Sequence, residues 1–221
     1  MTFLELCVEL RRLAGISGTG PADVTLQTGE YGRVVQWIVD SWINIQSKFE
    51  GEWDFLWTEF SKVTVASTRD YEYRTSSGIA KFDNESFTIY LTADGASTKR
   101  YLQYVPYEEF KDVYWDSATE GYPSIVTILP RGGYRLYPTP DDVYTVQAVG
   151  FDVPVRLSAN TDTPTLPEEL HMVIVYKALM DYAGYEASRE AMDDARLKFD
   201  GLWSDVLKLR YLPEDMVVRP Q

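Results

Sequence analysis

The sequence has few of the residues that build most chemical sites. It contains one cysteine, Cys7, and one histidine, His171, in 221 residues. A single cysteine excludes an internal disulfide framework and a cysteine-based zinc site. Glu168 and His171 have the E-x-x-H spacing of carboxylate-bridged metal centres, but such centres need a second copy of that motif. We therefore predict no cofactor, no metal and no enzymatic activity. We expect Cys7 to be a core-packing residue and His171 to be a helix-surface or helix-packing residue.

Basic residues are also scarce relative to acidic ones. The chain has 21 Lys and Arg against 34 Asp and Glu, which gives a formal net charge of -13. This balance disfavours gripping nucleic acid or docking on anionic lipid, since both depend on Lys and Arg. The most apolar run, Leu170 to Met180, is shorter than the roughly 20 residues that span a bilayer. The N-terminus has acids within its apolar run and lacks a cleavage-type site, so we expect no signal peptide.

Familiar catalytic and phosphate-binding motifs are missing too. Residues 15–29 are rich in glycine, but a phosphate-binding P-loop would need a lysine directly after its last glycine, and none follows Gly20. We predict an exposed loop between helices there. No G-x-S-x-G sequence marks a nucleophile, although composition alone leaves a Ser–His–Asp arrangement open.

What the chain does have is helical periodicity at both ends. Four segments follow it: 2–14, 28–49, 166–185 and 188–211. The third is apolar on nearly every side, which is typical of a buried helix, so we place it at the centre of a helical core. We expect Thr165 to cap it and Pro167 to occupy its first turn.

The middle of the chain reads as a β-domain. Aromatic or β-branched runs alternate with Gly, Pro, Asn and Asp, which predicts strands separated by turns. The predicted strands are Glu59–Val65, Tyr71–Arg74, Phe87–Leu91, Arg100–Tyr104, Ser124–Leu129, Tyr134–Tyr137 and Val143–Phe151, with a short helix at Tyr107–Trp115. Their number and spacing indicate an antiparallel sandwich or small barrel.

The predicted fold class is therefore α+β. Residues 1–50 and 164–211 form a discontinuous, four-helix bundle-like domain, residues 51–163 form an inserted β-domain, and residues 212–221 form a C-terminal tail. The apolar cluster of Met216, Val217 and Val218 is either frayed or captured by a partner.

Aromatic residues are abundant, with 16 Tyr and 6 Trp. Trp37 lies off the apolar stripe of its predicted helix. Two interpretations stay open for it: it shields the stems of neighbouring side chains, or it anchors a contact with another subunit, because exposed aromatics concentrate at interfaces.

The ordered combination of four segments resembles the head-to-tail adaptor, or connector, proteins of tailed bacteriophages. These segments are FLELCVELRRLAGISGTGP, TGEYGRVVQWIVDSWINIQ, RLYPTPDD and LPEELHMVIVYKALMDYAGYE. The likeness is to the kind found in short-tailed phages, where a β-domain is inserted into a helical adaptor, and it covers essentially the whole chain.

The resemblance implies a structural protein of the virion neck, assembled in the host cytoplasm. Such adaptors form a ring, usually of twelve copies, beneath the portal protein. The ring extends the DNA channel and offers a platform for a tail or nozzle protein. DNA passes through without specific binding, which suits an acidic chain. By position, the portal-docking tail includes Leu212, Met216, Val217, Val218 and Arg219.

Two rival functions stay open at this point. An aromatic-rich sheet could bind a glycan or another protein at the surface of a virion or cell, which would require exposed Tyr and Trp gathered on one face. A hydrolase would require a perturbed carboxylate pair in a deep pocket.

Overall fold

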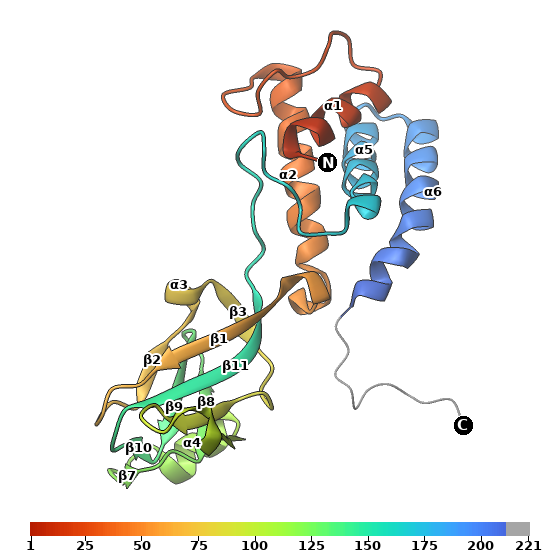
Figure 1. The fold of residues 1–221 in the computed structure, drawn as a ribbon. Coiled ribbons are helices and arrows are strands. Elements are labelled where there is room, and N and C mark those ends of the chain that lie inside the picture. The colour runs from red at the N-terminus through yellow and green to blue at the C-terminus, as the bar shows by residue number, and fades with distance from the viewer. Residues whose placement is uncertain (211–221) are drawn as a thin grey trace. The chain divides into compact units, whose positions relative to one another are not determined.

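The computed structural model describes residues 1–210, which divide into two compact units. The helical unit joins Met1–Leu56 to the residues from Pro154 onward, and the β-unit comprises Trp57–Val153. Helices lie at both ends of the chain and mainly antiparallel sheets lie between them (Figure 1), which confirms the predicted α+β class.

The helical unit is built from four long helices. They are α1 (Phe3–Leu13), α2 (Gly29–Gln46), α5 (Met172–Tyr185) and α6 (Arg189–Val206), with short 3₁₀ turns at Lys48–Gly51, Asp54–Leu56, Glu168–Leu170 and Leu207–Leu209. The Thr2 hydroxyl accepts a hydrogen bond from the Glu5 amide while the Glu5 carboxylate accepts one from the Thr2 amide. This reciprocal capping box begins α1 as its S/T-x-x-E spacing predicts.

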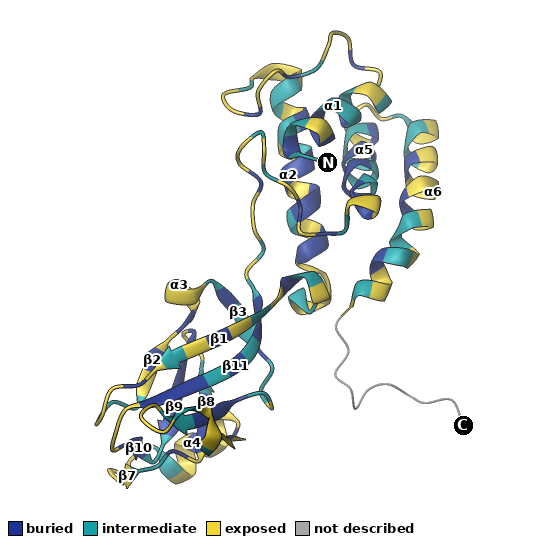
Figure 2. Cartoon of the chain, viewed as in Figure 1, coloured by how far each residue is buried: buried dark blue, intermediate teal, exposed yellow. Residues whose placement is uncertain are grey.

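Helix α5 is the centre of this unit, as predicted. It packs against each of the other three long helices. Its buried side chains are Val173, Ile174, Val175, Ala178, Leu179 and Ala183. Figure 2 shows α5 mainly as buried or intermediate, whereas α6 carries exposed residues along its length. A nearly apolar helix of this kind is stable only when neighbours cover most of its surface.

The predicted start of this central helix is wrong. Pro167 adopts an extended backbone (ψ 140°), residues 168–170 form a 3₁₀ turn, and the α-helix begins at Met172. No side chain caps either element, so Thr165 does not play the predicted role. The His171 ring turns back to the non-helical segment, where its Nε2 lies 2.7 Å from the Leu166 carbonyl oxygen.

Helix α2 ends earlier than predicted, at Gln46 rather than near Phe49. Phe49 and Glu50 adopt left-handed conformations, with φ of 53° and 59°, and no right-handed helix can continue through them. Helix α6 likewise ends at Val206 rather than at residue 211.

The β-unit contains two principal sheets. The first has the order β1 (Trp57–Val63), β11 (Tyr144–Asp152), β4 (Thr88–Leu91), β5 (Arg100–Tyr101), with β3 (Ile79–Phe82) also paired to β11. The second has the order β2 (Asp70–Glu72), β9 (Gly133–Tyr137), β8 (Ile125–Leu129), β6 (Gln103–Tyr104). Strands β7 (Glu120–Gly121) and β10 (Thr139–Pro140) form a small third sheet, and α3 (Arg74–Ser77), α4 (Tyr107–Tyr114) and the 3₁₀ turn Gly95–Thr98 complete the unit.

One apolar core joins the two principal sheets. Phe60 and Val146 reach it from the first sheet, and Tyr134 and Leu136 reach it from the second. The unit is therefore a sandwich, as the strand spacing predicted. The predicted strand Arg100–Tyr104 is split into β5 and β6, because the chain passes there from one sheet to the other. Strand β3 and the two-residue strands β7 and β10 were not predicted.

The boundaries of the units depend on one buried tryptophan. Trp53 is fully buried, and its indole Nε1 donates a hydrogen bond to the Ile45 carbonyl at 3.1 Å. Its ring also contacts Trp203 of α6 edge-on. Residues 51–56 therefore lie with the helical unit. Residues 154–163 also belong to it, although both segments were predicted to be part of the inserted β-domain.

We predict that Ile174→Ala lowers the free energy of unfolding of the helical unit by about 2–5 kcal/mol, because it opens a cavity under a fully buried side chain. Urea unfolding followed by tryptophan fluorescence measures this change. Leu197→Ala is the matched control, since Leu197 is 74% exposed on α6 and its loss should change stability by no more than about 0.5 kcal/mol. Equal effects of the two variants would contradict a central role for α5.

Candidate interaction surfaces

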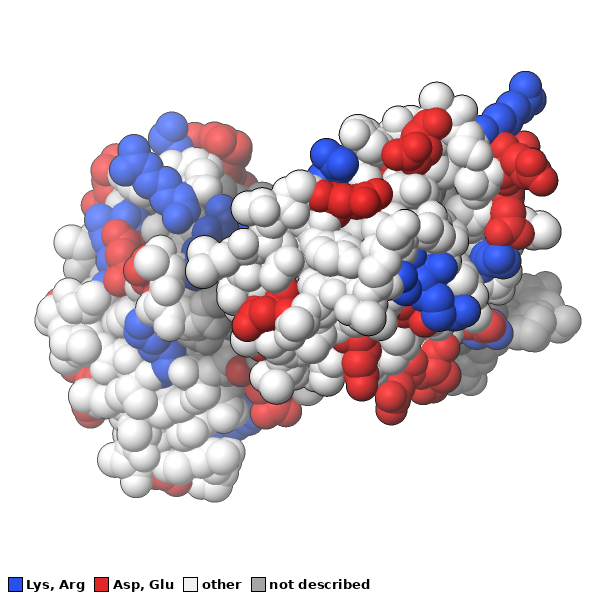
Figure 3. All heavy atoms as spheres, turned by 90° about the horizontal axis from the view of Figure 1, so that it is seen from above, with Lys and Arg blue, Asp and Glu red and all other residues white. Residues whose placement is uncertain are grey.

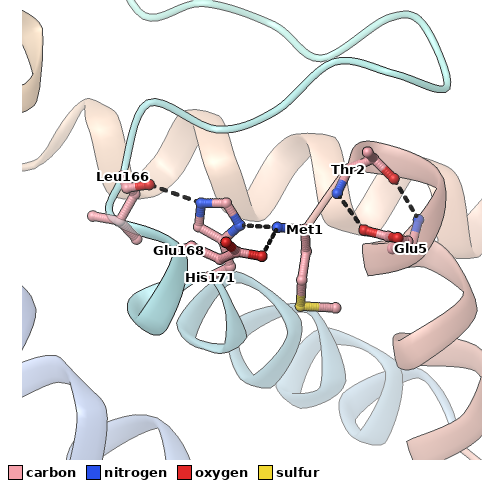
Figure 4. Close-up of polar contacts among 6 residues, drawn as sticks. All are labelled: Met1, Thr2, Glu5, Leu166, Glu168 and His171. Atoms are coloured by element: carbon pink, nitrogen blue, oxygen red, sulfur yellow. Dashed lines mark hydrogen bonds and ion pairs between the residues drawn. The ribbon is translucent and has the colours of Figure 1, made fainter.

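The single histidine is part of a buried polar contact at the start of α5 (Figure 4). Its Nε2 lies 2.7 Å from the Leu166 carbonyl oxygen, and its Nδ1 lies 2.8 Å from the Met1 amine. A carbonyl can only accept, so Nε2 carries the hydrogen and Nδ1 accepts from the ammonium group. Glu168 Oε1 accepts a hydrogen bond from the same amine at 3.2 Å.

Both ring nitrogens of His171 are therefore used within the fold. Neither is left to bind a metal or to move a proton, which supports the interpretation of His171 as a packing residue. Among residues 1–210, no three His, Cys, Asp or Glu side chains come together in an arrangement that could hold a metal ion.

Cys7 lies fully buried on the inner face of α1. Burial raises the pKa of its thiol to about 12, because the apolar surroundings disfavour the thiolate. The reactive form of the side chain is thus suppressed, as expected for a packing cysteine.

Trp37 belongs to an aromatic group shared by α2 and α5. Its ring meets Tyr182 edge-on at 5.7 Å and Tyr185 in a tilted arrangement at 5.8 Å. The Arg33 guanidinium lies 4.7 Å from the centre of the Tyr185 ring. Trp37 is half-buried, while Tyr185 remains 56% exposed. We call Arg33, Trp37, Tyr182 and Tyr185 the α2–α5 aromatic patch.

This geometry bears on both interpretations of Trp37. The ring does cover neighbouring side chains, namely two tyrosines of α5. The patch nevertheless leaves aromatic and guanidinium surface open to a partner. The sequence singled out only Trp37, because Tyr182 and Tyr185 are brought beside it by tertiary packing.

A second aromatic cluster gathers where the helical unit ends. Trp53 stacks on Phe55 at 5.4 Å, and Phe199 stacks on Trp203 at 5.2 Å. Arg210 forms an antiparallel bridge with Trp53. This cluster joins α2, the 3₁₀ turns and α6 into one packed end, and most of its surface is used internally.

The β-unit offers one open sheet face. A hollow of about 480 Å³ lies on the first sheet, between side chains that include Glu59, Lys99, Tyr101 and Gln147. The exposed aromatics of this sheet are Trp57 and Tyr101, but they are not neighbours. Tyr101 aligns across β4 and β11 with Ser61, four residues or about 13 Å along β1 from Trp57. The stacking platform that a glycan-binding face requires is not formed by these two side chains.

A buried arginine holds the other sheet to the segment after α4. The Arg135 guanidinium lies 3.7 Å from the centre of the Trp115 ring and makes two hydrogen bonds, of 2.5 and 2.7 Å, to the Asp70 carboxylate. Stacking together with a bidentate pair is a geometry that only arginine offers. This group fixes the fold of the β-unit.

Charged side chains are not sorted by sign. Figure 3 shows Lys and Arg interspersed with Asp and Glu on the face in view. On α6, Lys198 pairs with Asp194 at 2.6 Å, and Lys208, in the 3₁₀ turn that follows, pairs with Asp205 of α6 at 2.6 Å. The face in view therefore shows no continuous basic stripe of the kind that grips a phosphate backbone. The helices between residues 1 and 210 include none that is long and apolar enough to cross a bilayer.

The chain matches a known protein family over nearly its whole length. A family model described as SU10 adaptor protein matches residues 1–215. The chain belongs to the SU10 adaptor protein family. This membership agrees with the resemblance to phage head-to-tail adaptors and makes the chain a structural component of a virion that interacts with other phage structural proteins. It also implies a non-enzymatic protein. No curated protein matches the chain.

The predicted portal-docking residues Leu212, Met216, Val217, Val218 and Arg219 lie outside the described part of this SU10 adaptor.

We predict that Cys7 of the folded adaptor resists thiol reagents. A pKa of about 12 leaves only about one thiolate in ten thousand at pH 8. Labelling with an aromatic disulfide reagent at pH 8 should therefore be at least about 100-fold slower in buffer than in guanidinium chloride, where the ordinary thiol pKa is restored. Rapid stoichiometric labelling of the folded chain would contradict this account of Cys7.

Proposed function

We propose that copies of this adaptor form a closed ring beneath the portal protein, that the ring joins the capsid to the tail, and that it extends the DNA channel. The observation that carries this proposal is the family match over residues 1–215, which spans both units. The structure supports it in a second way. The side chains that could do chemistry, Cys7 and His171, are used in packing, while aromatic and apolar groups stay exposed.

A ring of this kind needs two different surfaces on each copy. A head-to-tail contact closes into a ring when the rotation between neighbours divides a full turn. Helix α5 packs against both α2 and α6, and each of these two helices keeps an exposed face. The helical unit therefore has separate surfaces for a preceding and a following copy. Twelve copies is the number that the resemblance to other adaptors implies.

The α2–α5 aromatic patch is our candidate for one of these surfaces, with Trp37 as its central residue. Trp, Tyr and Arg are the residue types most enriched among interface positions that carry binding energy. In the patch, one of each kind is already in mutual contact. Little side-chain freedom would therefore be lost when a partner covers it.

We predict that Tyr185→Ala raises the protein concentration needed for ring formation at least about tenfold. It should change the stability of the monomer little, because Tyr185 is 56% exposed. Mass photometry over a concentration series measures the effect. Val113→Ala, which removes an exposed side chain (63% accessible) from α4 of the β-unit, serves as control. Assembly of the Tyr185 variant at the wild-type concentration would remove the patch from the interface.

We assign portal docking to the residues after Arg210, including Leu212, Met216, Val217, Val218 and Arg219. Support comes from the last described residue before them. Arg210 is bridged to the buried Trp53, and its guanidinium lies 4.7 Å from the centre of the Phe49 ring. The docking residues thus start from a fixed place on the ring.

The adaptor would line the channel without binding DNA tightly. A net charge of -13 and interspersed surface charges disfavour lasting contacts with phosphates. Sliding of DNA is then limited by steric fit. The far side of the ring would present a platform to a tail or nozzle protein.

Electron microscopy of the adaptor mixed with its cognate portal protein tests this function. We expect rings attached to the portal, and a chain ending at Asp215 should attach more weakly, since it lacks Met216, Val217, Val218 and Arg219. Urea unfolding of the shortened chain is the control for folding. Failure of the full-length chain to bind the portal would overturn the proposed function, and undiminished binding of the shortened chain would overturn only the docking assignment.

A further inference from the structure

The first sheet of the β-unit ends in two strands whose outer edges are open. Within residues 1–210, β1 pairs with β11 alone, beside which it lies in Figure 1, and β5 pairs with β4 alone. The strands β1, β11, β4 and β5 follow one another in this order, and each runs antiparallel to the next. An edge strand offers a row of unpaired N–H and C=O groups to another strand. Because the two edges lie on opposite sides of the sheet, one copy can use both at once.

Strand β1 is a long and unprotected edge. Its seven residues pair with β11 without a bulge, and none of them is proline. The Thr64 amide, next in register, donates a hydrogen bond to the Tyr144 carbonyl. Hydrogen-bonded pairs alternate with non-bonded pairs along an antiparallel ladder, so the even-numbered residues of β1 also direct their backbone groups to β11. The residues that direct their N–H and C=O groups away from β11 are Trp57, Glu59, Ser61 and Val63.

The edge at β5 is shorter but of the same kind. The Leu102 amide donates a hydrogen bond to the Phe87 carbonyl. By the same alternation Arg100 directs its backbone groups to β4, whereas Tyr101 directs its N–H and C=O away from β4. Lys99 precedes this strand with an extended backbone, φ −59° and ψ 130°. The open edge of β5 is therefore centred on Tyr101.

The side chains at the two edges are complementary. Glu59 precedes Phe60, which faces the core, so Glu59 projects from the outer face of the sheet, as Trp57 does. Lys99 and Tyr101 line the same outer hollow as Glu59. These four outward side chains are exposed, and neither Glu59 nor Lys99 forms an ion pair with another residue in the range 1–210. One edge thus presents an aromatic ring and a carboxylate, and the other presents an aromatic ring and an ammonium group.

We propose that β5 of one copy pairs with β1 of the next, so that the first sheets of neighbouring copies join edge to edge around the ring. Within one sheet β1 and β5 run in opposite directions, so copies related by rotation bring them together antiparallel. In the best-matched register Tyr101 faces Trp57 and Lys99 faces Glu59, and cross-strand pairs of both kinds are stabilising. Pairing of β1 with a second β1 would instead be two-fold and would stop at a dimer. This inference rests on the ring proposed above and names a contact of its β-units.

Charge reversal tests the pairing. Glu59→Lys alone and Lys99→Glu alone should each raise the protein concentration needed for half-assembly by about three- to tenfold, because like charges directly opposite one another destabilise a strand pair. The double variant should assemble like wild type. Within one copy the two residues lie three strand spacings, about 14 Å, apart across the sheet, so rescue reports a contact between copies.

The matched controls are Glu109→Lys and Lys111→Glu, which make the same charge changes on exposed positions of α4. They should leave assembly unchanged, and urea unfolding should show that every variant folds. Single reversals that assemble like wild type, or a double variant that is no better than the singles, would overturn the pairing.

A pair of cysteines tests the register. Directly opposite residues of an antiparallel pair lie about 5.5 Å apart, which a disulfide can bridge. Glu59→Cys combined with Lys99→Cys should therefore give a ladder of covalent multimers on non-reducing gels of portal-bound rings, and the native Cys7 is fully buried and should not compete. Rings without a ladder, or quantitative dimers of the Glu59→Cys single variant, would overturn the proposal and leave the ring itself in place. Absence of wild-type rings would remove the proposed function together with this contact.

Discussion

The need to cover the apolar surface of α5 is the constraint on which the helical unit depends. An apolar helix with almost no polar face must be covered by several partners, and here they come from both ends of the chain: α1 and α2 from the first 50 residues, α6 from the last. The β-unit is consequently an insertion whose two connections both return to helical residues. Local sequence signals alone would not bring α1 and α5 together. The hydrophobic effect does so, because the surface of α5 has no other apolar cover.

This dependence explains which parts of the fold could be predicted. The four helices and most strands follow from periodicity, which is read over many residues and survives local errors. The start of α5 could not be predicted, because the capping rules favoured Thr165 and Pro167, whereas Pro167 is extended and the His171 ring contacts the Leu166 carbonyl. The end of α2 could not be predicted either, since the positive φ of Phe49 has no sequence signature. The boundary of the insert lies later than predicted, because Trp53 packs on Trp203 of α6.

The candidate surfaces were only partly visible in the sequence. Trp37 was found because it broke a helical stripe, but the tyrosines that make it a patch lie some 145 residues away along the chain. The glycine-rich loop was recognised as a loop between helices. The hydrogen bonds that hold it, from Tyr31 and to Asn160, could not be predicted, because they are tertiary. The open edges of the first sheet gave no signal at all, because the order of strands in a sheet depends on pairing between distant segments.

Weak contacts between copies suit an adaptor better than strong ones. Each cross-strand pair contributes about 0.2–1 kcal/mol, and an exposed aromatic patch adds a few more buried side chains. A contact of that size would leave single copies free in dilute solution, so rings would close only on a portal or at high protein concentration. In the proposed assembly on a portal, each copy would touch two neighbours and the template together, and the later contacts would form at high effective concentration. The same modest contacts would then hold the proposed ring, because the loss of one copy would break three interfaces at once.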